Sequence, residues 1–109
     1  MAATRNARGV DVIAYDSRCK RTLAIQVKTL SIRNPVPLGQ SLDRFVGDWW
    51  IIVTKAADPQ PVCYVMKPRE VKNRAHRGVK DGKISYWLQP NSYDKKRFKE
   101  AWHRIGTAN

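Results

Sequence analysis

The chain has 109 residues, enough for one domain with one modest core, and 42% of them are hydrophobic. This composition excludes a disordered tail, and the sequence contains no apolar run long enough to span a membrane. The charge is unusual, because 21 Lys and Arg residues outnumber 9 Asp and Glu residues and give a formal net charge of +12. A positive field of this size attracts polyanions, of which nucleic acid is the commonest.

Other interpretations of the charge stay open. A basic but inert surface is one, whereas an anionic membrane surface is disfavoured because no segment joins a basic face to a large apolar face. Cys19 and Cys63 are too few for a disulfide framework, and the N-terminus is too polar for a signal peptide. These cysteines and the two histidines lack the paired spacing of zinc ligands. We expect one domain over residues 1–109, cytoplasmic, with reduced thiols and no membrane partner.

Two strand hairpins are predicted in the first part of the chain. Residues 10–15 and 22–29 form the first, because apolar and polar residues alternate along 22–29 and a short polar stretch separates the two segments. Residues 34–39 contain two prolines and a glycine, which favour a loop. The continuous apolar run at 49–54 predicts a strand buried on both faces, followed by a turn and a strand at 62–66.

A helix and a short strand are predicted next. Pro68 suits the first position of a helix, which we expect to cover residues 69–77 and to end at Gly78. The dipeptide Asp81-Gly82 predicts a turn, and the apolar and aromatic residues at 84–88 predict a short strand.

The last helix is predicted over residues 95–105, with Asp94 as its N-cap. Its apolar residues recur on one helical face; they are Phe98, Ala101, Trp102 and Ile105. The order of the elements predicts an α/β (α+β) fold with a central mixed sheet of about four to five strands and flanking helices. Later helices, a partner chain, or an N-terminal helix lacking here would have to cover both faces of this apolar sheet.

Three polar side chains are expected on one face of the first hairpin. Gln26 and Lys28 are two residues apart in one strand and project to the same side, and Asp11 can come near them across the hairpin. The apolar residues of that strand face the core; they are Leu23, Ile25 and Val27. Taken singly, Asp11 is explained by a turn, Gln26 by a solvent-facing position and Lys28 by the many surface lysines, but together they favour a site.

The chemistry that needs this set is metal-assisted phosphodiester hydrolysis. Asp11, the side chain at position 26 and the backbone carbonyl of Val27 would offer oxygen ligands to Mg²⁺ or Mn²⁺. The metal would polarise the phosphate and lower the pKa of bound water. Lys28 would position the attacking water and stabilise the developing negative charge.

Gly9-Val10-Asp11 followed by Ile25-Gln26-Val27-Lys28-Thr29 resembles the G-x-D … (E/Q)-x-K signature of the PD-(D/E)XK nuclease superfamily. The sequence is most similar to the branch with Gln in place of Glu, which includes some homing-endonuclease-like and Holliday-junction-resolvase-like proteins, and Asn6 suits that branch. Over most of its length the chain is similar to small prokaryotic proteins of this group. The resemblance implies a restriction-endonuclease-like core and Mg²⁺-dependent cleavage of DNA.

The chain departs from that family in two ways. Gln26 replaces the usual acid, so the site carries less negative charge and should hold its cation less tightly. Such proteins also carry a helix with a further Glu before the Asp strand, and this chain has no room for it. We therefore expect an N-terminally truncated chain, an acid supplied by a partner, or a fold that has lost catalysis.

Basic and aromatic residues complete the predicted binding surface. The predicted nucleic-acid contacts are Arg5, Asn6, Arg8, Arg69, Lys72, Arg74 and Arg77. Lys80 extends this set, and a further basic group lies at 95–104; a solvated helix face is the simpler interpretation of such runs. The four tryptophans are expected in the core, although an exposed Trp50 or Trp87 would be a base-stacking platform.

Three functional hypotheses follow. The first is a metal-dependent endonuclease acting on DNA. The second is a catalytically inactive nuclease fold that binds DNA or RNA. The third is a protein-interaction subunit whose open sheet face is covered by another chain. A homodimer is a related expectation, because two-fold symmetry matches the two strands of a duplex substrate.

Overall fold

The computed structural model describes residues 2–4, 12–15, 22–43 and 47–106. In the described part of the chain, strands alternate with short helices. The elements in chain order are β1 (Ala2–Thr4), β2 (Val12–Tyr15), β3 (Thr22–Thr29), β4 (Val36–Gly39), β5 (Trp49–Thr54), β6 (Val62–Met66), α1 (Pro68–Arg74), β7 (His76–Lys80), β8 (Lys83–Leu88), α2 (Pro90–Tyr93) and α3 (His103–Gly106).

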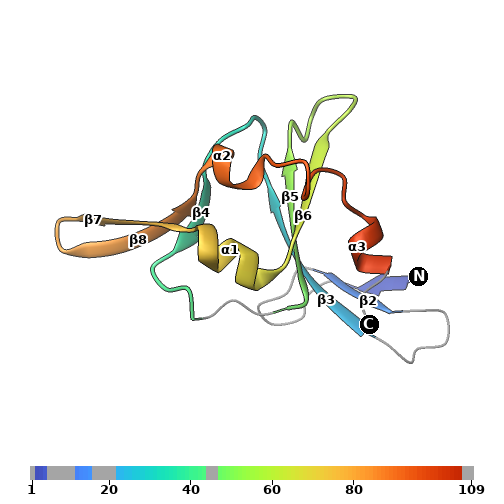
Figure 1. Ribbon diagram of the computed structural model, residues 1–109, viewed down its shortest axis with the longest axis horizontal. Helices are drawn as coiled ribbons and strands as arrows, with labels where there is room; N and C mark the ends of the chain where they lie inside the picture. Colours follow the sequence, from blue (N-terminus) through green and yellow to red (C-terminus); the bar gives the residue numbers. More distant parts are fainter. Residues whose placement is uncertain (1, 5–11, 16–21, 44–46, 107–109) are drawn as a thin grey trace.

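The strands form two sheets. The larger has the order β1-β2-β3-β5-β6, and the smaller has the order β4-β8-β7. The pair β3–β5 is parallel and every other pair is antiparallel. Figure 1 shows the β7–β8 hairpin extending away from the larger sheet at one end of the molecule, with α3 at the opposite end. The predicted mixed α/β fold is confirmed at this level.

Both predicted hairpins of the first part are present. β2 pairs antiparallel with β3, with Val12 opposite Ile25, and β5 pairs antiparallel with β6, with Trp50 opposite Met66. The apolar run of β5 is buried on both faces, as predicted, and only Val53 of its six residues is half-buried. β-Branched and aromatic side chains favour such an extended, pleated backbone.

The alternation of β5 and β6 divides the core between the two faces of the larger sheet. One face carries the first cluster, whose buried members are Val36, Leu38, Trp50, Ile52, Tyr64, Met66, Val71, Leu88, Tyr93 and Phe98. The other face carries the second cluster, whose buried members are Trp49, Ile51, Val65 and Ala101. The first face is covered by the smaller sheet and by residues of α1 and α2. The second face is covered by residues 94–105, which we call the C-terminal segment.

The loop predicted at 34–39 is wrong in part, because Val36–Gly39 is strand β4. Val36 and Leu38 alternate inward while Pro37 is exposed, so the segment has the period of a half-buried strand. Among the described strands, β4 pairs with β8 alone, so it is an edge strand of the smaller sheet. A proline is tolerated there because its missing N–H need not enter a ladder on the outer side.

The helix predicted over 69–77 ends early, at Arg74, and the chain continues as β7. Asp81 and Gly82 both have positive φ, 53° and 75°, which is the backbone of a two-residue type I′ hairpin turn. Gly78, predicted to end the helix, instead lies within β7 opposite Ser85. The Asp-Gly pair thus specifies a hairpin that extends back over the predicted end of the helix.

The long helix predicted over 95–105 is also wrong, since α3 covers only His103–Gly106. Phe98 belongs to the first cluster and Ala101 to the second, so this segment passes around the edge of the larger sheet from one face to the other. The N–H of Val65 donates to the carbonyl of Phe98 at 2.8 Å, and the N–H of Glu100 donates to the carbonyl of Cys63 at 2.7 Å. The segment therefore protects the β6 edge.

Two further predictions change with this helix. Trp102, predicted on its apolar face, is 45% exposed. Asp94, predicted as its N-cap, accepts a hydrogen bond from Arg33 Nε at 2.8 Å instead. Within the described residues, no helix is long and apolar enough to cross a membrane.

Candidate functional site

Strand β3 divides its side chains as the alternation predicted. Gln26 is the ladder partner of Trp50 and Lys28 the partner of Ile52, so both polar side chains project to the face of the first cluster. The alternate residues pack against the second cluster; they are Leu23, Ile25 and Val27. The shared face of Gln26 and Lys28 is thus confirmed.

A pocket of about 660 Å³ opens where these two side chains meet the end of β4. Gln26, Lys28 and Trp50 line it from the larger sheet. The other lining residues come from β4 and the loop after it; they are Leu38, Gly39, Gln40, Ser41 and Asp43. The paired strands β3 and β5 form one wall of the pocket, and the polar loop after β4 forms its rim.

The Lys28 side chain lines this pocket, and its ammonium group lies near an aromatic ring. Its Nζ lies 5.6 Å from the ring centroid of Trp50, within the range of a cation–π contact. Trp50 is 3% exposed and belongs to the core, so the ring is a fixed support. Lys28 is half-buried in the wall of the pocket, and its ammonium group can donate hydrogen bonds to an anionic ligand there.

Asp43 is an exposed acidic residue that also lines this pocket, and it was not among the predicted site residues. Its backbone N–H donates to Ser41 Oγ at 3.1 Å, a local bond that shapes the loop. No periodicity or motif marks Asp43 in the sequence. It lines the same pocket as Gln26 and Lys28 because the loop that follows β4 lies beside these two residues of β3.

The described donors suit a hard cation in kind. The amide oxygen of Gln26 and the carboxylate of Asp43 are the oxygen ligands that Mg²⁺ takes. Asp11, the predicted principal ligand, lies outside the described residues. Val27 directs its side chain to the second cluster, and the role of its backbone carbonyl stays a prediction. Across the described ranges, no three His, Cys, Asp or Glu residues form a group that could hold a metal ion.

The predicted nucleic-acid contacts fall in different places. Arg5, Asn6 and Arg8 lie outside the described residues. The others lie on α1 and β7, away from the pocket lining; exposed among them are Arg69, Lys72 and Arg77. Arg74 is half-buried, and its guanidinium carbon lies 5.1 Å from the ring centroid of Phe98, so packing alone accounts for its position.

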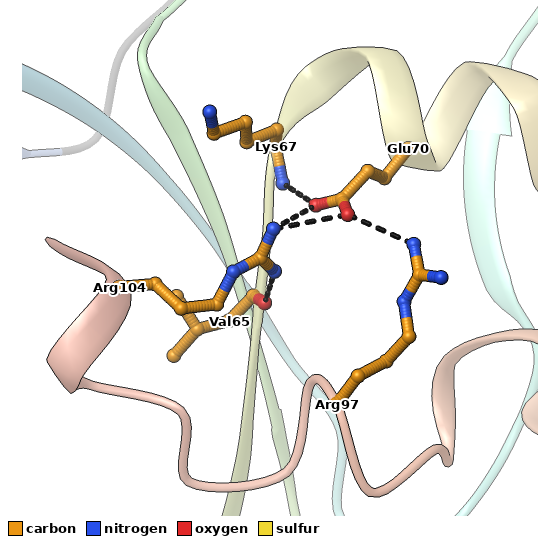
Figure 2. Close-up of polar contacts among 5 residues, drawn as sticks. All are labelled: Val65, Lys67, Glu70, Arg97 and Arg104. Carbon is orange, nitrogen blue, oxygen red and sulfur yellow. Dashed lines mark hydrogen bonds and ion pairs between the residues drawn. The ribbon is translucent and has the colours of Figure 1, made fainter. Parts of the chain in front are cut away.

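Glu70 on α1 neutralises two arginines of the C-terminal segment (Figure 2). Arg104 Nη2 donates to both of its carboxylate oxygens at 2.9 and 3.0 Å, and Arg97 Nη2 donates at 3.1 Å. The N–H of Lys67 donates to Glu70 Oε1 at 2.7 Å and caps the helix. Arg104 also donates to the Val65 carbonyl at 2.8 Å. These arginines fasten α1, β6 and the C-terminal segment together.

The surroundings of Glu70 set its pKa. Burial alone would raise the pKa of this carboxyl, but the Lys67 N–H and the guanidinium groups of Arg104 and Arg97 outweigh burial and lower it. By contrast, burial, followed by the nearby Glu100, raises the pKa of the Cys63 thiol. The thiol is thereby held protonated, which makes it a poor metal ligand or nucleophile.

Comparison with protein-family models found no match, and neither did comparison with curated proteins or with solved structures. The similarity to PD-(D/E)XK nucleases therefore rests on the motif residues and stays a prediction.

Proposed function

We propose that the chain is a nucleic-acid-binding domain that acts on DNA, with a metal-dependent phosphodiesterase site at the pocket of Gln26 and Lys28. The observation that carries the proposal is the shared pocket, which Gln26, Lys28 and Asp43 line together and in which the Lys28 ammonium lies near the Trp50 ring. A net charge of +12 supports a polyanionic substrate. The proposal includes a restriction-endonuclease-like core with the larger sheet at its centre, and a cytoplasmic location.

The residues divide the work by charge. Asp11, Gln26 and Asp43 would hold Mg²⁺ or Mn²⁺ as oxygen donors, and the cation, when bound, polarises the scissile phosphate. Lys28 donates a hydrogen bond to a phosphate oxygen or to the attacking water, and its charge opposes the charge that develops on the phosphate. Asp43 gives the pocket a carboxylate where the usual acid is replaced by Gln26.

The test is cleavage of supercoiled plasmid and synthetic junctions with Mg²⁺ or Mn²⁺. We expect the Lys28→Ala variant to lose about 100-fold or more in rate, because a charge aimed at the reacting phosphate is removed. Asp43→Asn and Asp11→Ala should lose rate as well. Lys96→Ala is the matched control, since it removes one exposed lysine outside the pocket. Equal unfolding curves for Lys28→Ala and the parent would separate chemistry from folding.

Full activity in Lys28→Ala would contradict the site. A parent that binds DNA in a salt-dependent way but cuts nothing would point to the second candidate function, an inactive nuclease fold that binds nucleic acid. One observation favours that candidate: among the described lining residues, Asp43 is the single carboxylate. Absence of both binding and cleavage would overturn the proposal as a whole.

A further inference from the structure

The β7–β8 hairpin presents a mixed aromatic and basic face. Residues opposite each other in an antiparallel pair project to the same side, as do residues two apart in a strand. The register places one such set together, which we call the outer face; its members are His76, Gly78, Lys80, Lys83, Ser85 and Trp87. On the other side of the hairpin, Tyr86 and Leu88 pack with the first cluster, so the outer face points away from the core.

The indole of Trp87 reaches over Gly78 on this face. A Cβ atom built on Gly78 would stand 2.6 and 2.7 Å from Cζ3 and Cη2, the outer edge of the six-membered ring, so that edge occupies the space beside Gly78. The His76 ring is stacked beside it, with centroids 5.9 Å apart and planes inclined by 24°. The glycine thus makes room for the edge of the indole, and Trp87 is only half-buried.

The two lysines at the tip of the hairpin repel each other and have no ion-pair partner among the described residues. Lys80 and Lys83 are exposed and directly opposite each other, and like charges in that position destabilise strand pairing. Neither forms an ion pair with another residue of the described ranges. A polyanion bound at the tip would remove the repulsion that the hairpin itself leaves in place.

We infer that the outer face binds single-stranded nucleic acid, with an unpaired base stacked on Trp87 and phosphates contacting Lys80 and Lys83. Stacking needs a base whose face is accessible, which a strand offers when it is unpaired and a continuous duplex does not. The four-residue separation of Lys83 and Trp87 spans about 13 Å of strand, or about four stacked nucleotides. The inference rests on the proposed function, which names nucleic acid as the partner. It adds that the bound nucleic acid is single-stranded.

Fluorescence anisotropy tests this inference with labelled oligo-dT, oligo-rU and a blunt duplex, each of about 15 nucleotides per strand. We expect the parent to bind the single strands more tightly than the duplex, and Trp87→Ala to weaken that binding about 10-fold while Trp87→Phe restores most of it. Lys80→Ala with Lys83→Ala should lower the slope of log K against log salt by about 1.4, because two phosphate contacts are lost.

A double variant of Lys95→Ala and Lys96→Ala is the matched control, because it removes the same charge from exposed positions on the C-terminal segment. The tip lysines are exposed, so their variants answer the question even where Trp87→Ala disturbs the hairpin. Preference for the duplex, unchanged binding in the hairpin variants, or an equal loss in the control would overturn the inference and leave nucleic-acid binding standing. No binding by the parent would instead overturn the proposed function. The ratio of oligo-dT to oligo-rU affinity assigns DNA or RNA.

Discussion

The β7–β8 hairpin and the C-terminal segment at 94–105 are both basic in sequence, and the structure uses their charges in opposite ways. In the C-terminal segment, Arg97 and Arg104 converge on Glu70. In the hairpin, Lys80 and Lys83 are exposed and pair with no carboxylate among the described residues. The two arginines of the C-terminal segment therefore hold the fold together, while the two lysines of the hairpin are available to a ligand.

This difference shows that counting basic residues does not locate a binding surface. A single acidic residue, Glu70, turns the guanidinium groups of one segment into structural links that close the core. The hairpin offers its own acid only at the turn, where Asp81 adopts the positive φ that the type I′ geometry demands. The position of the acids, rather than the number of bases, separates the structural charges from those available to a ligand.

Removing Glu70 should have the largest effect on stability. Glu70→Ala leaves Arg104, whose side chain is 22% exposed, without its carboxylate partner, and we expect a loss of about 3 kcal/mol in the free energy of unfolding. The Lys80→Ala and Lys83→Ala double variant should change it by less than about 0.5 kcal/mol. Urea unfolding followed by tryptophan fluorescence measures both. Similar values for the two variants would break the contrast between the segments.

Acid should destabilise the protein through the same contacts. The pKa of Glu70 is lowered, and the hydrogen bond from Arg33 lowers the pKa of Asp94. A carboxyl with a lowered pKa contributes its full stabilisation above its unfolded pKa, about 4, and loses it as pH falls through the folded value. We therefore expect stability to decline below about pH 4, as the unfolded state binds more protons.

Glu70→Gln isolates the share of that decline that belongs to the C-terminal segment. At pH 6 the variant should be less stable than the parent by about 2 kcal/mol, the contribution of hydrogen bonds to a charged group. This difference should shrink as pH falls and Glu70 of the parent becomes protonated. A difference that stays constant down to about pH 2 would show that the carboxylate charge does not stabilise the segment.

The strands of the larger sheet were predictable because their patterns are local. Alternation along β3 separates Gln26 and Lys28 from the apolar residues, and the apolar run of β5 has no helical alternative of that length. The segment at 95–105 was not, because Phe98 and Ala101 have a helical spacing but enter different clusters. The chain crosses the edge of the larger sheet between these two residues, so they pack on opposite faces. The spacing of apolar residues in the sequence does not reveal such a crossing.

The candidate site, like the fold, was predictable only where it depends on a local pattern. The shared face of Gln26 and Lys28 follows from a period of two, whereas Asp43 joins them through the pairing of β4 with β8. The dipeptide Asp81-Gly82 predicted the turn of the hairpin. The first strand of the hairpin was missed because the helix that begins at Pro68 was predicted to continue to residue 77, into β7. The packing of Trp87 on Gly78 depends on strand register, which a sequence pattern does not supply.

Gly78→Ala should lower stability less than the Glu70 variants do, and it should have a selective effect on binding. The new Cβ would overlap the far edge of the Trp87 indole, and because that edge can move, we expect a cost of only about 1 kcal/mol. Displacing the ring removes the stacking surface, so single-strand binding should fall about as far as in Trp87→Ala, about 10-fold. Near-ultraviolet circular dichroism would report the altered environment of the indole.

Ser85→Ala is the matched control for Gly78→Ala, since Ser85 is the exposed residue paired with Gly78 on the same face and its substitution adds no atom beneath the ring. It should leave both stability and binding near those of the parent. If Gly78→Ala lowers stability but keeps single-strand binding, the contact between Trp87 and Gly78 serves the packing of the hairpin alone. The Trp87 contact would then stabilise the hairpin only, as the ion pairs with Glu70 stabilise the C-terminal segment.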